Sequence, residues 1–243
     1  MAEQYFAGYP MEEMLFEGHR AAVVHPTIRR EDGLWAIYTE YFGAFPAVAQ
    51  ALLAEGVVLL RLDNDSRWGK DEDADRRARF LKQVRPQYGL SEKGILIGMS
   101  CGGLNAVKFA ALHPECVRVL YLDAPVMNFL SCPLGCDGAD RDESTVVEFL
   151  RDLGIAESEV AAYKDQPLAS LSQVVRKGIP AALLYGTADS TVPYASNGIW
   201  VEKAYREHLV PLLVQCKEGC GHHPHGPDNM QHMKELVDFL LGK

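Results

Sequence analysis

A serine flanked by glycines lies where the sequence changes from a strand pattern to a helix pattern. Gly98-Met99-Ser100-Cys101-Gly102-Gly103 joins the apolar run ILIGMS to an amphipathic stretch. So short a connection forces a strained turn, and glycines two before and two after the serine remove Cβ atoms that would clash there. The Ser100 hydroxyl would then stand clear of the sheet as a nucleophile. The Cys101 amide, rather than its thiol, could stabilise an oxyanion.

A serine hydroxyl needs a base that is oriented by a third group. Asp189 is our first choice of acid, because it lies in YGTADSTVP directly after the apolar run PAALLYG. This places it at the carboxyl edge of a predicted sheet, where open α/β sheets bind ligands. An aspartate in such a loop also commonly caps a turn. Asp123, which also ends a predicted strand, is the alternative acid, followed by Asp63.

Three histidines follow the last predicted strand, in the segment Gly219-Cys220-Gly221-His222-His223-Pro224-His225-Gly226. A base at the first sharp turn beyond the strand would best reach back to the serine. This favours His222, with His225 as the alternative.

The same segment offers an alternative chemistry, because soft metal ligands recur there at short spacing. These are Cys216, Cys220, His222 and His225, and zinc accepts such ligands. Cys216 should alternate into the sheet while Cys220 lies in the loop, and a second cysteine pair is lacking nearby. We therefore predict no metal and no cofactor.

Composition excludes some partners. The chain has 24 basic and 33 acidic residues, a formal net charge of -9. This argues against nucleic acid, whose binding needs a basic patch. The amino terminus has no basic segment followed by an apolar one, and no apolar run approaches membrane-spanning length. We expect a small-molecule ester as partner, no membrane association and a cytoplasmic location, unless a signal peptide has been removed.

Six cysteines are a low density for 243 residues. Small disulfide-stabilised secreted domains are far richer in cysteine, so reduced thiols are expected. Cys132 and Cys136 are close enough in sequence to pair in an oxidising compartment.

The elements that would position these residues alternate between strand and helix patterns, which predicts an α/β fold with a parallel sheet. The expected strands cover residues 21–26, 57–63, 95–100, 117–125, 180–186 and 210–217. The expected helices cover residues 35–45, 46–56, 71–89, 102–114, 197–208 and 233–242. We expect one domain, 1–243, in which residues 126–178 break the alternation and form a small cap insertion.

In these motifs the chain resembles the α/β-hydrolase superfamily. GMSCGG, YGTADSTVP and GCGHHPHG occur in the order Ser, acid, His that this fold uses. The last two are similar to the family's G-x-x-D-x-x-V-P and G-x-G-H loops. The resemblance implies an α/β-hydrolase fold with a mostly parallel central sheet, helices on both faces and a small cap. It also implies a triad of Ser100, Asp189 and His222.

The resemblance further implies a second oxyanion donor in the loop after strand 21–26, around Thr27 or Ile28. This loop lacks the HGGG-like run of lipases. The GHHPHG run is most similar to small bacterial hydrolases related to prolyl oligopeptidase catalytic domains and to carbohydrate acyl esterases.

The sequence thus predicts a serine hydrolase that cleaves a carboxylic ester with a short acyl group, carbohydrate esters included, through an acyl-enzyme at Ser100. The alternatives are a prolyl-oligopeptidase-like peptidase, and a non-hydrolytic lyase or binding protein on the same fold. Substrate selection should fall to the 126–178 cap, the loop near Trp68 and an aromatic segment that could equally pack in the core. That segment contains Trp35, Tyr38, Tyr41 and Phe42.

Overall fold

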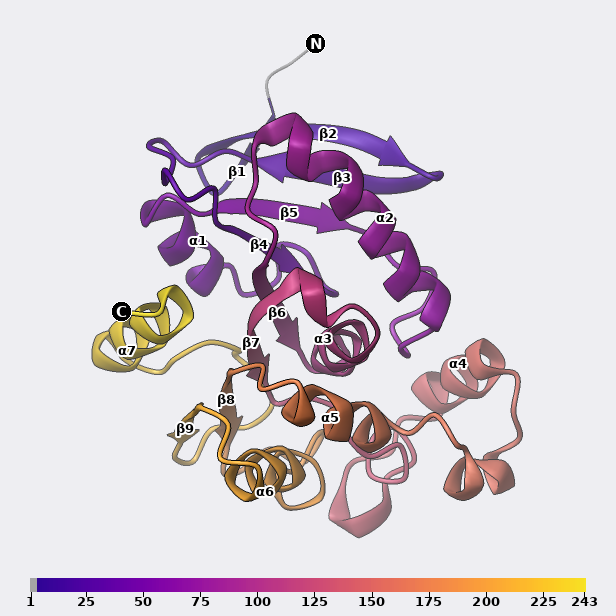
Figure 1. Ribbon diagram of the computed structural model, residues 1–243. Helices are drawn as coiled ribbons and strands as arrows, with labels where there is room; N and C mark the ends of the chain where they lie inside the picture. Colours follow the sequence, from indigo (N-terminus) through magenta and orange to yellow (C-terminus); the bar gives the residue numbers. More distant parts are fainter. Residues whose placement is uncertain (1–3) are drawn as a thin grey trace.

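One β-sheet runs through the molecule, and a computed structural model describes residues 4–243 (Figure 1). Within these residues the sheet has nine strands in the order β1-β2-β3-β5-β4-β6-β7-β8-β9. The strands are β1 (Gln4–Phe6), β2 (Tyr9–Phe16), β3 (His19–Val24), β4 (Trp35–Tyr38), β5 (Val58–Leu62), β6 (Gly94–Met99), β7 (Val117–Asp123), β8 (Ala181–Gly186) and β9 (Leu212–Lys217). From β5 to β9 along this order all pairs are parallel. The predicted, mostly parallel sheet is confirmed.

The first three strands form an antiparallel edge, of which the sequence pattern predicts only the last strand. β1 pairs with β2, β2 with β3, and β3 with β5, all antiparallel. Both hairpin connections have two residues, and all four of these have positive φ: Ala7 52°, Gly8 88°, Glu17 48° and Gly18 82°. This backbone is that of type I′ turns, whose twist matches that of paired strands.

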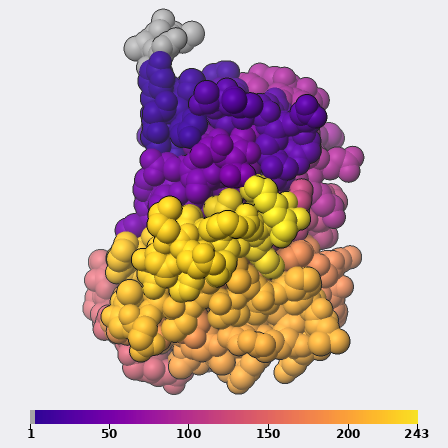
Figure 2. Space-filling view, turned by 90° about the vertical axis from the view of Figure 1, so that its left-hand side faces the viewer, coloured from indigo at the N-terminus to yellow at the C-terminus, as the bar shows by residue number. Residues whose placement is uncertain are grey.

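Helices cover both faces of the sheet, as predicted (Figure 1). They are α1 (Ala47–Ala54), α2 (Asp71–Tyr88), α3 (Cys101–Leu112), α4 (Glu143–Leu153), α5 (Pro167–Arg176), α6 (Gly198–Glu207) and α7 (Met230–Leu241). α1 packs beside α7 on one face, while α2, α3, α5 and α6 pack side by side on the other. Figure 2 shows the C-terminal segment, in yellow, lying across the molecule between the N-terminal part and the orange segment that precedes it.

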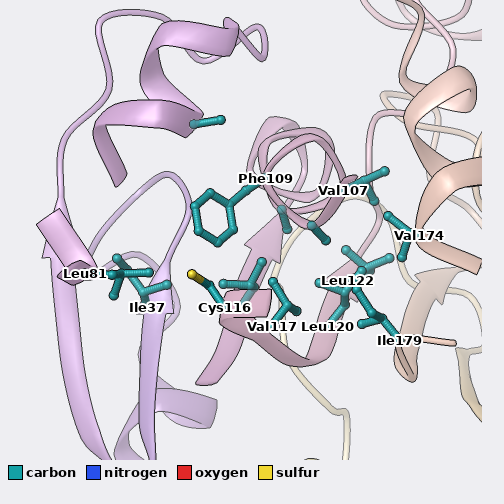
Figure 3. Packing of buried hydrophobic residues seen from close by; sticks show 14 of the residues in the cluster. Ile37, Leu81, Val107, Phe109, Cys116, Val117, Leu120, Leu122, Val174 and Ile179 are labelled. Atoms are coloured by element: carbon teal, nitrogen blue, oxygen red, sulfur yellow. The ribbon is translucent and has the colours of Figure 1, made fainter. Parts of the chain in front are cut away.

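The two faces of the sheet have separate hydrophobic clusters because side chains alternate along each strand. In β6, Leu96 points to the cluster beneath α2, α3, α5 and α6, whereas Ile95 and Ile97 point to the cluster beneath α1 and α7. Figure 3 shows part of the first cluster, including Phe109 from α3. The central strands are therefore buried on both faces, and their carboxyl ends make a rigid platform.

The predicted helix over residues 35–45 is wrong. Residues Trp35–Tyr38 form the buried strand β4, which pairs in parallel with both β5 and β6. A four-residue strand that is buried on both faces has no alternation of apolar and polar residues, so its sequence cannot be told from that of a buried helix. Trp35 and Tyr38 are core residues, whereas Tyr41, in the loop beyond the strand, is not.

Residues 126–178, expected to form the cap, are divided in the structure between two places. α5 packs against α3 and contributes Leu171 and Val174 to the main core. α4 and the 3₁₀ helix η3 (Glu157–Ala162) instead belong to a third hydrophobic cluster, with Trp68 and the first residues of α3. Only the earlier part of the segment therefore lies over the carboxyl edge of the sheet near Ser100.

Candidate active site

Ser100 occupies the turn between β6 and α3 with φ 52° and ψ -123°. This is a strained conformation for a residue with a side chain, and such strain is concentrated at functional sites. A Cβ atom at Gly98 would lie 2.7 Å from the carbonyl oxygen of Gly102, so glycine is required there. The turn is held by two backbone bonds: the Ser100 amide donates to Asp123 O (2.9 Å), and the Val126 amide donates to Ser100 O (3.1 Å).

The Ser100 hydroxyl, the His222 imidazole and the Asp189 carboxylate form one hydrogen-bonded chain. His222 Nε2 lies 3.1 Å from Ser100 Oγ, and His222 Nδ1 lies 2.8 Å from Asp189 Oδ2. Asp189 comes from the loop after β8, and His222 from the loop after β9. Because β6, β8 and β9 are parallel, all three residues meet at the carboxyl edge of the sheet.

The Asp189 carboxylate is held in its charged form. Its other oxygen, Oδ1, accepts the amides of Thr191 (2.9 Å) and Val192 (2.8 Å). Burial alone would raise the pKa of Asp189, but the hydrogen bond and charge of His222 and these two amides lower it below its ordinary value. An ionised Asp189 accepts the His222 Nδ1 proton, so Nε2 is left to accept the proton of Ser100.

A second histidine–aspartate pair, His225 and Asp123, lies behind the first. His225 Nδ1 is 3.1 Å from Asp123 Oδ1, and both side chains are buried. Lys217 Nζ lies 3.5 Å from the same oxygen. Burial opposes ionisation of Asp123, but His225, Lys217 and the Gly226 amide lower its pKa below the ordinary value. The side chains of these two alternative residues do not hydrogen-bond to the Ser100 hydroxyl.

Ser100 and His222 open into a cavity of about 360 Å³. It is lined by Tyr41, Ala44, Phe45, Arg67, Trp68, Met99, Ser100, Cys101, Cys132, Thr145, Thr191, His222, His223 and His225. Thr145 comes from α4, and Arg67 is tied to that helix by a bidentate ion pair with Glu148 (2.8 Å for both bonds). The part of the expected cap that contains α4 thus borders the candidate site.

Known structures share this architecture. The chain matches a dipeptidyl peptidase 4 from Porphyromonas gingivalis (TM-score 0.70, 16% identity, 96% of this chain and 35% of that one). It also matches a puromycin-hydrolyzing peptidase from Mycobacterium tuberculosis (TM-score 0.73, 15% identity, 97% and 39%) and a bacterial membrane phospholipase A (TM-score 0.65, 18% identity, 98% and 87%). The chain has the α/β-hydrolase fold. It spans little more than a third of the length of the two peptidases.

No protein-family model and no curated protein sequence matches the chain. The assignment to the α/β-hydrolase fold therefore comes from the arrangement of the sheet and helices, at identities too low to transfer an activity.

The structure corrects the expected position of the second oxyanion donor in this α/β-hydrolase fold. β3 runs antiparallel to β5, so the loop that follows it, with Thr27 and Ile28, lies at the amino edge of the parallel strands. There the Arg30 amide donates to the carbonyl of Gly56, which precedes β5 (3.1 Å). Thr27 is exposed there and cannot serve the Ser100 site.

The loop that does reach Ser100 follows β4, the strand next to β6. Tyr41, Ala44 and Phe45 from this loop line the cavity, and Tyr41 has a positive φ of 56°. The residue pattern over 35–45 predicts a helix, so this role of the loop was not expected from the sequence. The strained backbone at Tyr41 is a signal that only the structure supplies.

The Cys101 thiol is buried beside Ser100. Burial raises its pKa to about 11, so it is a protonated thiol at neutral pH rather than a nucleophile. Cys101 is the first residue of α3, where a backbone N–H has no partner within the helix.

The alternative acid Asp63 lies apart from Ser100, and the alternative zinc ligands are not grouped as a metal site. Asp63 forms a bidentate ion pair with Arg61 (2.7 and 2.8 Å) at the end of β5. Across residues 4–243 no three His, Cys, Asp or Glu side chains are grouped to hold a metal ion. Cys132 is buried and Cys136 is exposed, and both are free thiols. None of the helices described here is long and apolar enough to cross a membrane.

Proposed function

We propose that this protein is a serine hydrolase that cleaves a carboxylic ester through an acyl-enzyme at Ser100. One observation carries the proposal: a serine on a strained strand-to-helix turn is hydrogen-bonded to His222, which is hydrogen-bonded to the buried Asp189. This arrangement activates a hydroxyl that is otherwise a weak nucleophile. It opens into a cavity large enough for a small acyl or alcohol group.

In the first half of the reaction, Ser100 Oγ attacks the ester carbonyl carbon while His222 Nε2 takes the hydroxyl proton. Asp189 stabilises the imidazolium that forms. The tetrahedral intermediate collapses as His222 returns the proton to the leaving alcohol. Water then attacks the acyl-enzyme with His222 as the base, and Ser100 is regenerated.

Two amides are candidates to stabilise the oxyanion. The first is Cys101 N–H at the start of α3. We assign the second to the loop after β4, with Tyr41 N–H as the best candidate. Among residues 4–243 its only hydrogen bond is a long one, 3.4 Å, to the carboxylate of Glu40, so this N–H is available to a stronger acceptor.

A peptidase is the second candidate, because two of the matched structures are peptidases and the same triad cleaves amides. The matched phospholipase supports the ester as the first candidate.

The test is hydrolysis of p-nitrophenyl esters from acetyl to octanoyl and of peptide p-nitroanilides, together with labelling by a fluorophosphonate. The wild type is expected to hydrolyse the short esters, and Ser100→Ala to lose both turnover and labelling. Labelling with turnover of anilides alone would establish the peptidase. An unlabelled wild type that turns over nothing would contradict a serine hydrolase.

A further inference from the structure

His225 is held in one orientation although it does not contact Ser100. Its Nδ1 faces Asp123 Oδ1, while Asp123 Oδ2 accepts hydrogen bonds from Tyr121 OH (2.9 Å) and the Gly226 amide (2.6 Å). These bonds fix the carboxylate. His225 Nδ1 and Asp123 Oδ1 are 3.1 Å apart without hydrogen-bond geometry, so the contact between them is electrostatic. In the neutral ring it favours the tautomer with its proton on Nδ1, beside the carboxylate, which leaves a lone pair on Nε2.

The second nitrogen of His225 faces the cavity. No residue among 4–243 hydrogen-bonds to Nε2, yet, unlike Nδ1, it is not one of the fully buried unpaired atoms. His225 is a lining residue of the same cavity as Ser100 and His222. Since Nδ1 points away toward Asp123, Nε2 is the polar atom that the ring presents to a bound molecule.

Aromatic neighbours hold the ring in place. The His225 ring lies edge-on to His222 (4.8 Å between centroids, 81°), to His223 (5.1 Å, 86°) and to Phe45 (5.2 Å, 82°).

We propose that His225 Nε2 accepts a hydrogen bond from a hydroxyl group of the substrate next to the scissile ester, so that the substrates are esters of polyols or sugars, or of hydroxy acids. The inference rests on the proposed function and adds its substrate class. A fixed acceptor that would otherwise remain unpaired discriminates against a substrate that lacks the matching donor.

Matched ester pairs test this inference. Ethylene glycol monoacetate is compared with ethyl acetate for the alcohol side, and ethyl glycolate with ethyl propanoate for the acyl side. In the wild type, kcat/KM is expected to favour the hydroxylated member of at least one pair by about tenfold or more. His225→Phe keeps the ring but removes both nitrogens, and is expected to abolish that preference, mainly through KM.

Two further variants separate recognition from folding. His225→Gln retains a polar acceptor and is expected to recover part of the preference. His223→Phe is the matched change in the same loop, and should leave the preference within about twofold, since no carboxylate orients its ring. Thermal denaturation of each variant shows whether it is folded.

Two results would overturn the inference. One is a wild type without preference for the hydroxylated ester, and the other is a His225→Phe variant in which kcat/KM falls by the same factor for both esters of a pair. A second test measures the rate at which Ser100 is labelled by organophosphonates with and without a hydroxyl group. If Ser100 is labelled but no ester is hydrolysed, the proposed ester hydrolysis is wrong. The ratio of the two labelling rates then still tests the role of His225.

Discussion

Two histidine–aspartate pairs lie next to each other in this molecule and differ in what the second ring nitrogen reaches. In the pair His222–Asp189, Nε2 lies 3.1 Å from Ser100 Oγ. In the pair His225–Asp123, Nε2 faces the cavity without a partner among residues 4–243. In both pairs an aspartate oxygen faces Nδ1 of the imidazole, at 2.8 Å from His222 and 3.1 Å from His225. The comparison teaches that the position of Ser100, and not the His–Asp contact, distinguishes the two rings.

The pairs also differ in their charge surroundings. The negative charge of Asp189 is stabilised by His222 and by two backbone amides. Asp123 has a lysine beside it instead: Lys217 Nζ lies 3.5 Å from the carboxylate oxygen that faces His225. The Lys217 ammonium group is buried beside Asp123. It also donates a hydrogen bond to the carbonyl of Pro224 (3.0 Å). The second pair therefore supports the loop that contains His222 as well as its own ring.

The largest effect on kcat is expected from removing the Ser100 hydroxyl, which contacts only the first of the two pairs. Ser100→Ala should lower kcat for p-nitrophenyl acetate by about 10⁶-fold, because the covalent route is lost while the fold is kept. Steady-state and burst kinetics measure this, with circular dichroism as the control for folding. A variant that retains more than a tenth of the wild-type kcat would contradict the assignment of Ser100.

Replacing each of the two histidines by alanine, in separate variants, tests which ring acts as the base. His222→Ala is expected to lower kcat by about 10⁴-fold or more, since the serine then lacks a base. His225→Ala should cost only about tenfold on the same ester, through loosening of the loop. The reverse ranking in kcat would show that His225 is the base.

Replacing each aspartate by asparagine should affect a different property: kcat at Asp189 and stability at Asp123. Asp189→Asn is expected to lower kcat by about 10⁴-fold with little change in melting temperature, because the imidazole loses its required tautomer. Asp123→Asn leaves the buried Lys217 without its counter-charge and should cost about 3 kcal/mol of unfolding free energy. Urea denaturation and kinetics on both variants check this, and equal melting temperatures would refute the structural role of Asp123.

The smallest effect concerns His223, whose ring packs against both His222 and His225. Burial, followed by the neighbouring His222 and His225, lowers its pKa below 6.5. Since its folded pKa lies below its unfolded value, its contribution to stability is present above pH 6.5 and is lost as the pH falls through the folded value. An NMR titration of the ring protons should give a midpoint below 6.5, and a midpoint above it would contradict this environment.

Much of the candidate site was visible in the sequence because its signals are local. The GMSCGG turn needs small residues at set distances from Ser100, and the apolar runs before Ser100, Asp189 and His222 predict three strands. Parallel strands end at the same edge, so the order Ser, acid, His was enough to predict that these residues meet there.

Only the tertiary structure decided the remaining assignments. Strand order is set by packing between distant segments, so the sequence could not show that β4 lies between β5 and β6, or that β3 is antiparallel. The loop that reaches the Ser100 cavity therefore contains Tyr41, not Thr27. Likewise, the sequence favoured His222 but left His225 as an alternative. The path of the loop places His222 beside Ser100 and His225 beside the buried Asp123. Local residue patterns determine which groups are available, whereas the packing of distant segments determines which of them meet.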